Sequence, residues 1–308
     1  MITIRLGSFS NSLIDTVARR TGMYRDEFID VEFCRVLSSP SQFEKLSNGE
    51  IDVALTATDN VLNYRYNQSP GNTSSLDIRI IRGVELSGGV SLVAGPTVQS
   101  LQDLRGALIA VDDTNSGFAL LLYELLARAG LVRGLDYDVV VFGGTPRRFK
   151  GVVDGEVDAT MLHAGFDLRA ADHGCSILGT VSDALPRYMT TVLAALPAWL
   201  EGESAPQQFL RAWDRAAVYA KNPVNSQACI DMIQRHFVVT EQLATRMYKQ
   251  ATDPQFGLMV GGGVSRSGVS EVAHVRRRHG ELGDGVDIAA ALQEPFGLID
   301  QRYARVFE

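Results

Sequence analysis

A seventeen-residue segment occurs twice in this chain, 106 positions apart, and it constrains the fold more than any other feature. The first copy is PSQFEKLSNGEIDVALT at residues 40–56, and the second is PRRFKGVVDGEVDATML at residues 146–162. Proline, phenylalanine, glycine, glutamate and aspartate stand at the same offsets in both copies, and apolar residues fill several matching positions. The chain therefore contains an internal duplication.

Each copy has the signals of a helix followed by a strand. Ser39 and Thr145 can cap a helix, and the proline that follows each of them suits the first helical turn. Gly49 and Gly155 suit the left-handed conformation that ends a helix. The mostly apolar residues after these glycines predict short strands.

The residues upstream of each copy extend the similarity. The first unit is predicted to have strands at 2–6, 29–36 and 51–55 with a helix at 12–22, and the second to have strands at 108–111, 137–142 and 157–161 with a helix at 118–129. Both units then follow the order strand, helix, strand, helix, strand. This order predicts α/β lobes with parallel strands and right-handed crossovers. Duplicated units that share no cleft remain an alternative.

The repeat also predicts how the chain divides. We expect residues 1–94 and 196–308 to form one lobe, and residues 95–195 to form the other. The chain would then cross between the lobes twice, and a two-strand hinge suits opening and closing. We expect the helical patterns at 206–221, 224–236 and 240–249 to pack back on the first lobe.

Composition narrows the classes of function. The chain of 308 residues has a formal net charge of −7, which argues against nucleic acid because phosphate binding needs a concentrated basic face. Its one basic run, Arg276–Arg278, is interpreted as a solvated helix face. The three cysteines are scattered, so neither a disulfide framework nor a zinc site is indicated. No stretch of the sequence is long and apolar enough to span a bilayer.

A ligand is expected at one edge of each sheet, because open parallel sheets bind ligands beyond the carboxyl ends of their strands. Helix starts near 115–117 and 143–146 also favour an anionic group. The residues predicted to bind the ligand lie in the loops after the strands, at the two helix starts and near the hinge. They are Ser8, Phe9, Ser10, Asn11, Thr58, Asp59, Asn60, Ser87, Gly88, Asn115, Ser116, Gly117, Gly144, Thr145, His163, Phe166, Asp167 and Tyr188.

Several of these residues have more than one possible role. Phe9 and Phe166 could enclose an apolar ligand body or belong to the core. His163 could donate to a ligand, or act as an acid or base if the protein is an enzyme. Arg147 and Arg148 could pair with an anion, but a surface role is favoured. No catalytic signature, metal site or cofactor motif is recognised, so no catalytic residue is assigned apart from this reservation about His163.

Three further segments resemble a known family. Residues 100–111 (SLQDLRGALIAV), 115–119 (NSGFA) and 125–131 (LLARAGL) resemble the second lobe of type 2 periplasmic solute-binding proteins, and GEIDVA at 49–54 resembles the first lobe. The closest group is the nitrate, sulfonate and taurine-like set of ABC-transporter proteins, which includes the thiamine-precursor-binding proteins. The resemblance covers about residues 1 to 235.

The resemblance implies two Rossmann-like lobes joined by a two-strand hinge. It also implies capture of a small solute and its delivery to an ABC permease. We expect a monomer that closes on a small, anionic or polar organic molecule. By position, Ser8, Asp59, Ser116, Thr145 and His163 would face the solute.

The start of the sequence differs from this family, because it has no leader and no lipid-attachment cysteine. We expect either a cytoplasmic protein, or a periplasmic or cell-envelope protein whose leader was removed. The same fold serves cytoplasmic enzymes such as chorismate dehydratase. Three functions therefore remain open: an importer's solute-binding component, a lyase or decarboxylase acting on a small carboxylate, and a ligand sensor.

Overall fold

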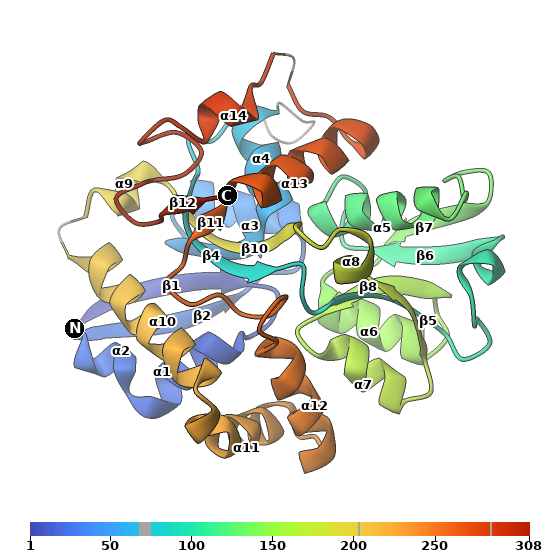
Figure 1. Ribbon diagram of the computed structural model, residues 1–308, viewed down its shortest axis with the longest axis horizontal. Helices are drawn as coiled ribbons and strands as arrows, with labels where there is room; N and C mark the ends of the chain where they lie inside the picture. The colour runs from blue at the N-terminus through green and yellow to red at the C-terminus, as the bar shows by residue number, and fades with distance from the viewer. Residues whose placement is uncertain (68–74, 203, 284) are drawn as a thin grey trace.

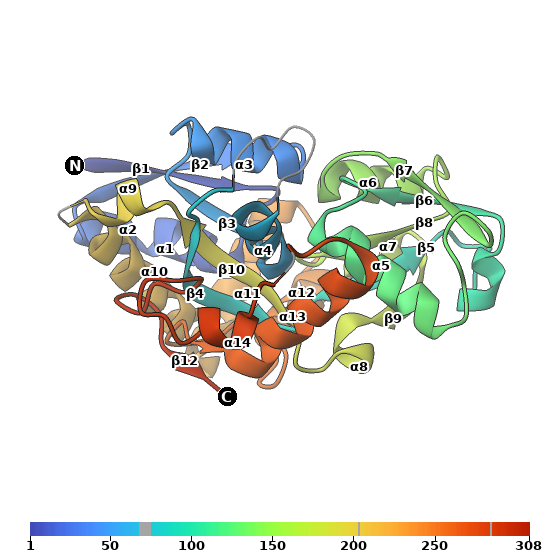
Figure 2. The ribbon, with the colours of Figure 1, turned by 90° about the horizontal axis from the view of Figure 1, so that it is seen from above.

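Two five-stranded sheets, each flanked by helices, form two lobes that lie side by side (Figures 1 and 2). The computed structural model describes residues 1–67, 75–202, 204–283 and 285–308. Within these residues, no helix is both long enough and apolar enough to cross a membrane.

The first sheet has the strand order β2-β1-β3-β10-β4. Strands β1 and β2 are parallel, as are β1 and β3, whereas β10 is antiparallel to both of its neighbours. The strands are β1 (Ile2–Ser8), β2 (Ile29–Arg35), β3 (Val53–Ala57), β10 (Met189–Ala195) and β4 (Arg79–Leu86). Helices of this lobe in the N-terminal part are α1 (Leu13–Thr21), α2 (Met23–Asp26), α3 (Ser39–Ser47) and α4 (Thr58–Tyr66).

The second sheet repeats this order as β7-β6-β8-β5-β9. Strand β6 is parallel to β7 and β8, and β5 is antiparallel to β8 and β9. The strands are β5 (Val90–Ala94), β6 (Ala107–Val111), β7 (Tyr137–Val141), β8 (Ala159–His163) and β9 (Ser176–Thr180). The helices are the 3-10 turn η1 (Leu101–Leu104), α5 (Gly117–Arg128), α6 (Thr145–Val153), α7 (Phe166–Asp172) and α8 (Val181–Ala184). The predicted α/β class and the duplication are both confirmed.

In each sheet, the antiparallel strand follows a point where the chain crosses from the other lobe. Strand β5, which we expected in the first sheet, pairs with β8 and β9 of the second sheet. Strand β10, which we expected at the end of the second lobe, pairs with β3 and β4 of the first sheet. We therefore propose that the crossings lie near residues 87–89 and 185–188, a few residues before each of the predicted boundaries.

The repeated helices end as predicted but are capped differently. Gly49 and Gly155, with φ of 69° and 72°, follow α3 and α6 in the left-handed conformation. The side chain that caps α3 belongs to Ser38, and α6 begins after Gly144 without a side-chain cap. Ser39 and Thr145 each lie one residue inside their helix, so their hydroxyl groups are free to make other contacts.

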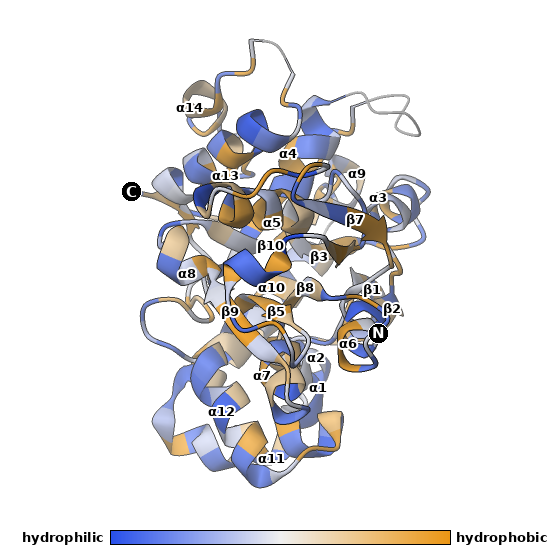
Figure 3. Cartoon of the chain, turned by 90° about the vertical axis from the view of Figure 1, so that its right-hand side faces the viewer, coloured by the Kyte–Doolittle hydropathy of each residue, from blue (hydrophilic) through white to orange (hydrophobic). Residues whose placement is uncertain are grey.

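The C-terminal part of the chain is mainly helical. Its elements are α9 (Pro197–Leu200), α10 (Ala205–Lys221), η2 (Pro223–Asn225), α11 (Ser226–Phe237), α12 (Glu241–Ala251), β11 (Val264–Ser265), α13 (Arg266–His279), α14 (Ile288–Ala291) and β12 (Val306–Phe307). As predicted, α10 and α11 pack on the first lobe, where they contact α1, whereas α12 also contacts α7 of the second lobe. In Figure 3, α11 and α12 carry both hydrophilic and hydrophobic residues, as expected of helices that bury one face.

Candidate ligand-binding cleft

A cavity lies between the lobes, at the carboxyl ends of the parallel strands. The first lobe contributes the loop after β1, the end of β3 and part of β4, and the second contributes residues that follow β6 and β8. Helices α11 and α12 supply further lining side chains, including Ile233, Phe237 and Met247. The empty space is about 1140 Å³, part of it open to solvent.

Eight of the eighteen predicted residues line this cavity. They come from five segments that are distant in the sequence, and both lobes contribute to them. These residues are Ser8, Phe9, Ser10, Asn11, Asn60, Ser116, Thr145 and His163. Ten of the predicted residues, discussed below, do not line the cavity.

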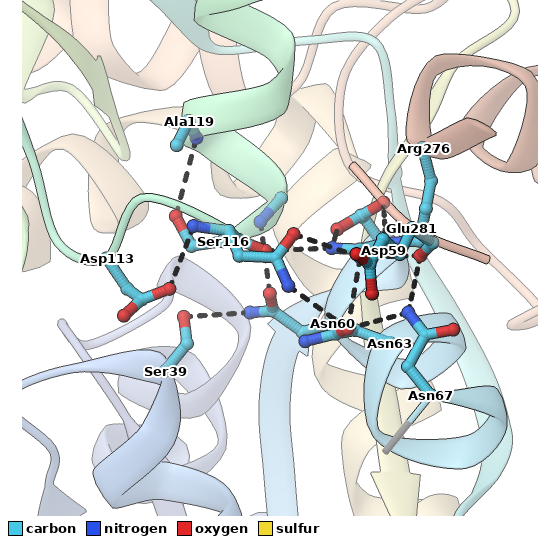
Figure 4. A network of polar contacts seen from close by, with 12 residues as sticks. Ser39, Asp59, Asn60, Asn63, Asn67, Asp113, Ser116, Ala119, Arg276 and Glu281 are labelled. Atoms are coloured by element: carbon cyan, nitrogen blue, oxygen red, sulfur yellow. Dashed lines mark hydrogen bonds and ion pairs between the residues drawn. The ribbon is translucent and has the colours of Figure 1, made fainter. Parts of the chain in front are cut away.

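Four of these ten lie in the first turn of α4 or at the start of α5. Asp59 forms a fully buried ion pair with Arg276 of α13, with Oδ2 and Nη2 2.6 Å apart (Figure 4). Arg276 also donates to the backbone oxygen of Asn115, and the backbone N–H of Gly117 donates to Asn60. Thr58 is fully buried as well. Asp59, Asn115 and Gly117 therefore take part in contacts between the lobes, Thr58 is buried outside the cavity, and Arg276 is not the solvated residue that we expected.

Three more of the ten belong to the crossings between the lobes. The hydroxyl group of Ser87 donates to the backbone oxygens of Leu185 and Tyr188. Gly88 lies so close to Phe256 that an added Cβ would be 1.6 Å from its backbone oxygen. The Tyr188 ring is buried in the main hydrophobic core. Ser87 and Tyr188 therefore join the two crossings, whereas Gly88 packs against the segment that contains Phe256.

The remaining three serve local packing. Phe166 packs in the core of the second lobe, where its ring lies 5.5 Å from that of Phe149. Asp167 is buried and accepts hydrogen bonds from Ser91 and Gln250. Gly144 lies against Phe9, since a Cβ added there would be 3.0 Å from that ring. Phe166 therefore does not pair with Phe9 across the cavity.

Arg148 lies at the cavity wall, and protein groups already accept its hydrogen bonds. Arg148 is buried, and its guanidinium donates to Thr160 at 3.1 Å, to the Gly143 oxygen at 2.8 Å and to the Met161 oxygen at 3.2 Å. It also lies 3.6 Å from the Asp112 carboxylate. Burial lowers the pKa of Arg148, and the Asp112 charge opposes this effect. Arg148 therefore braces the second lobe, and it is not the surface residue that we favoured; Arg147 is the exposed one of the pair.

Glu85 and His163 also line the cavity, and their pKa values are strongly shifted. Burial raises the pKa of Glu85 to about 7, although a hydrogen bond from Thr191 opposes this. That bond, of 3.0 Å, reaches one carboxyl oxygen of Glu85, and no hydrogen bond from the described residues reaches the other. Burial, followed by repulsion from Arg148, lowers the pKa of His163 to about 3. At neutral pH the His163 ring is therefore uncharged, and it contacts the Phe118 ring edge-on with centroids 4.9 Å apart.

Comparison of the sequence with protein-family models places this architecture in a family. The model described as NMT1/THI5 like matches residues 10–226, which include most of both sheets. The chain belongs to the NMT1/THI5-like family. A search of curated proteins finds no match to it.

Solved structures share the fold of this NMT1/THI5-like protein at low sequence identity. The nitrate-binding protein of Synechocystis matches with a TM-score of 0.77, 14% identity and coverage of 94% of this chain and 84% of that one. An alkanesulfonate-binding protein from Xanthomonas axonopodis, bound to MOPS, matches with a TM-score of 0.74, 14% identity and coverage of 100% of this chain and 99% of that one. A ligand-binding component of an ABC-type import system from Staphylococcus aureus matches with a TM-score of 0.70, 15% identity and coverage of 91% of this chain and 92% of that one. The expected type 2 periplasmic-binding-protein fold is confirmed.

Several lining residues of this NMT1/THI5-like protein were missed by the sequence analysis. Glu85 is the one acidic residue of the strand RIIRGVEL, which was a usable signal. Phe118 adjoins the predicted helix start at Ser116, and its aromatic ring was a second signal. Residues of α11 and α12 gave no such signal, because only the folded chain brings these helices to the cleft: Ile233, His236, Phe237, Met247, Gln250 and Ala251.

Proposed function

We propose that this protein is the solute-binding component of an ABC-type importer, and that its lobes close on one small organic molecule. The observation that carries the proposal is the cavity between two lobes that are joined by two crossings, lined from both sides. The family match supports it, as do three structural relatives described as binding nitrate, binding an alkanesulfonate, or serving ABC-type import. An ABC permease would be its partner.

The lining favours a polar organic solute over an anion. Polar side chains outnumber apolar ones around the wall, but the atoms exposed to the cavity are mainly apolar, and they include the rings of Phe9 from one lobe and Phe118 from the other. Arg148, the one arginine among the described residues that line the cavity, is occupied by protein acceptors, and His163 is uncharged at neutral pH. Glu85 offers a free carboxyl oxygen. We therefore propose a ligand with an apolar or aromatic body whose N–H or O–H group donates to Glu85.

Four compounds with one shared ring test this proposal: benzylamine, benzyl alcohol, benzoate and benzenesulfonate. We expect benzylamine and benzyl alcohol to raise the melting temperature, because a ligand that binds only the native state stabilises it. Isothermal titration calorimetry then gives each Kd. Phe9→Ala and Phe118→Ala should each weaken binding by about tenfold or more, since each removes a large aromatic contact.

Phe28→Ala is the matched control, because Phe28 is 73% exposed and lies outside the cavity. It should leave every Kd unchanged. Binding by benzoate and benzenesulfonate alone would show that the proposed ligand class is wrong. If none of the four bound, or if a bound compound were recovered chemically altered, the importer function itself would be rejected for this cavity.

A further inference from the structure

Helix α13 lies beside the line where the lobes meet, and it contacts both of them. It packs against α4 and β10 of the first lobe and against α5 of the second (Figures 1 and 2). It also lies outside residues 10–226, the part matched by the family model. The contacts described next are therefore made by a segment that the family match does not cover.

The first contact centres on Arg276, whose side chain is fully buried. On the first lobe it binds both carboxylate oxygens of Asp59, at 2.8 and 2.6 Å, and donates to Asn63 at 3.0 Å. On the second lobe it donates to the Asn115 backbone oxygen at 2.8 Å and to its side-chain oxygen at 3.3 Å. One guanidinium thus joins α4 to the loop that begins α5.

The second contact centres on Glu124, a fully buried carboxylate in α5. Arg278 of α13 lies 3.1 Å from one of its oxygens, and the His279 ring lies 2.6 Å from the other. Arg128, from the same helix as Glu124, donates to it at 2.7 Å. Burial would raise the pKa of Glu124, but hydrogen bonds from Arg128, His279 and Arg278 lower it to about 2. The carboxylate is therefore ionised at neutral pH and attracts α13.

We propose that α13 is a clasp that holds the two lobes closed over the cavity. The inference rests on the proposed opening and closing of the lobes. The loop before α5 carries Ser116, a cavity-lining residue, so moving the second lobe away from α4 would open the cavity. That movement would break the contacts of Arg276 with Asn115, and those of Arg278 and His279 with Glu124.

The clasp can open without leaving a buried charge unpaired, which would be costly. Arg276 would keep Asp59, which belongs to the first lobe, where α13 packs on α4 and β10. Glu124 would keep Arg128. Only the contacts between the lobes would be lost. The arrangement therefore suits a reversible closure better than a permanent structural bond.

Amide hydrogen exchange of the ligand-free protein tests the clasp at two reporter sites. The backbone N–H of Ser39 donates to Asp112 at 3.3 Å, and that of Gly117 donates to Asn60 at 3.1 Å. Both bonds cross between the lobes, so both amides become exchangeable when the lobes separate. We expect the double variant Arg278→Ala/His279→Ala to raise exchange at both amides by about tenfold or more. Amides within β1 should be unaffected.

Arg277→Ala is the matched control, since Arg277 lies on the same helix but donates to Val286 rather than to the second lobe. Glu124→Gln removes the charge from the other side and should produce a smaller increase at the same two amides. It also serves as the test variant if the double variant does not fold. Equal exchange in Arg277→Ala and in the clasp variants would overturn the proposal, as would a parallel rise in β1. Because no ligand is used, either result leaves the solute-binding proposal to its own test.

Discussion

Replacement of Glu85 by glutamine should stabilise the protein more at alkaline pH than at acidic pH. The cavity raises the pKa of this carboxyl group from 4.5 to about 7. Below pH 4.5 the group is protonated in both the folded and the unfolded chain. Between pH 4.5 and about 7 the unfolded chain has released a proton that the folded chain still holds, so the free energy of unfolding falls as pH rises.

The size of the effect follows from the same shift. Ionising Glu85 inside the cavity costs the folded state about 3 kcal/mol at pH values above the folded pKa. Glutamine has no such cost, and its amide oxygen can still accept the hydrogen bond from Thr191. Relative to the wild type, Glu85→Gln should therefore be more stable by about 3 kcal/mol at alkaline pH than it is at about pH 4.

Urea unfolding across this pH range measures the difference directly. Glu44→Gln is the control, because Glu44 lies exposed on α3 and its replacement should give a difference that varies little with pH. A Glu85→Gln variant that is less stable than the wild type by the same amount at every pH would refute the reasoning. A bound ligand that donates to Glu85 should reduce the pH dependence of the wild type, since it compensates the ionised carboxylate.

Two further predictions concern residues that the sequence analysis had placed at the ligand. Folding lowers the pKa of His163 from 6.5 to about 3, so between these pH values the unfolded chain binds a proton at this residue and the folded chain does not. The free energy of unfolding should therefore fall as pH decreases from 6.5 towards 3. His163→Asn should reduce this loss in the same urea titration. Gly88→Ala should destabilise the protein by about 1–3 kcal/mol, because its new Cβ would overlap the Phe256 oxygen. In Gly179→Ala, where nothing lies within 4 Å, the change should stay within about 0.5 kcal/mol, and equal effects of the two alanines would contradict this explanation.

The sequence predicted the helices and strands better than it predicted which strands pair within each sheet. The duplicated order of helices and strands was correct because periodicity, capping and glycine positions act locally. The placement of β5 and β10 was wrong, because both strands are almost entirely buried and their sequences do not indicate which sheet they join. Pairing of β10 with β3, across more than 130 residues, is decided only when the chain has folded.

The residues of the candidate site could be predicted only in part, because local sequence does not show which distant residue a side chain will contact. A polar residue after a strand suits both a ligand contact and a contact between lobes, and Asn60 and Asp59 illustrate the two outcomes side by side. Asn60 lines the cavity, whereas Asp59 binds Arg276, a residue 217 positions later. Local sequence could not reveal that partner. A basic run on a helix usually indicates a solvated face, and Arg276 is an exception because an acidic residue meets it inside the molecule.

The duplication explains why the scaffold was easier to predict than the ligand contacts. Gln42 and Arg148 occupy equivalent positions of the repeat, and each donates to the backbone oxygen of an equivalent strand residue, Leu55 in one lobe and Met161 in the other. The two side chains differ in charge but fasten helix to sheet in the same way. At the ends of the same strands the equivalence is lost, because Ala57 faces the cavity from one lobe and His163 from the other. Selection of a ligand therefore depends on positions at which the two halves no longer resemble each other, and the repeat gives no information about them.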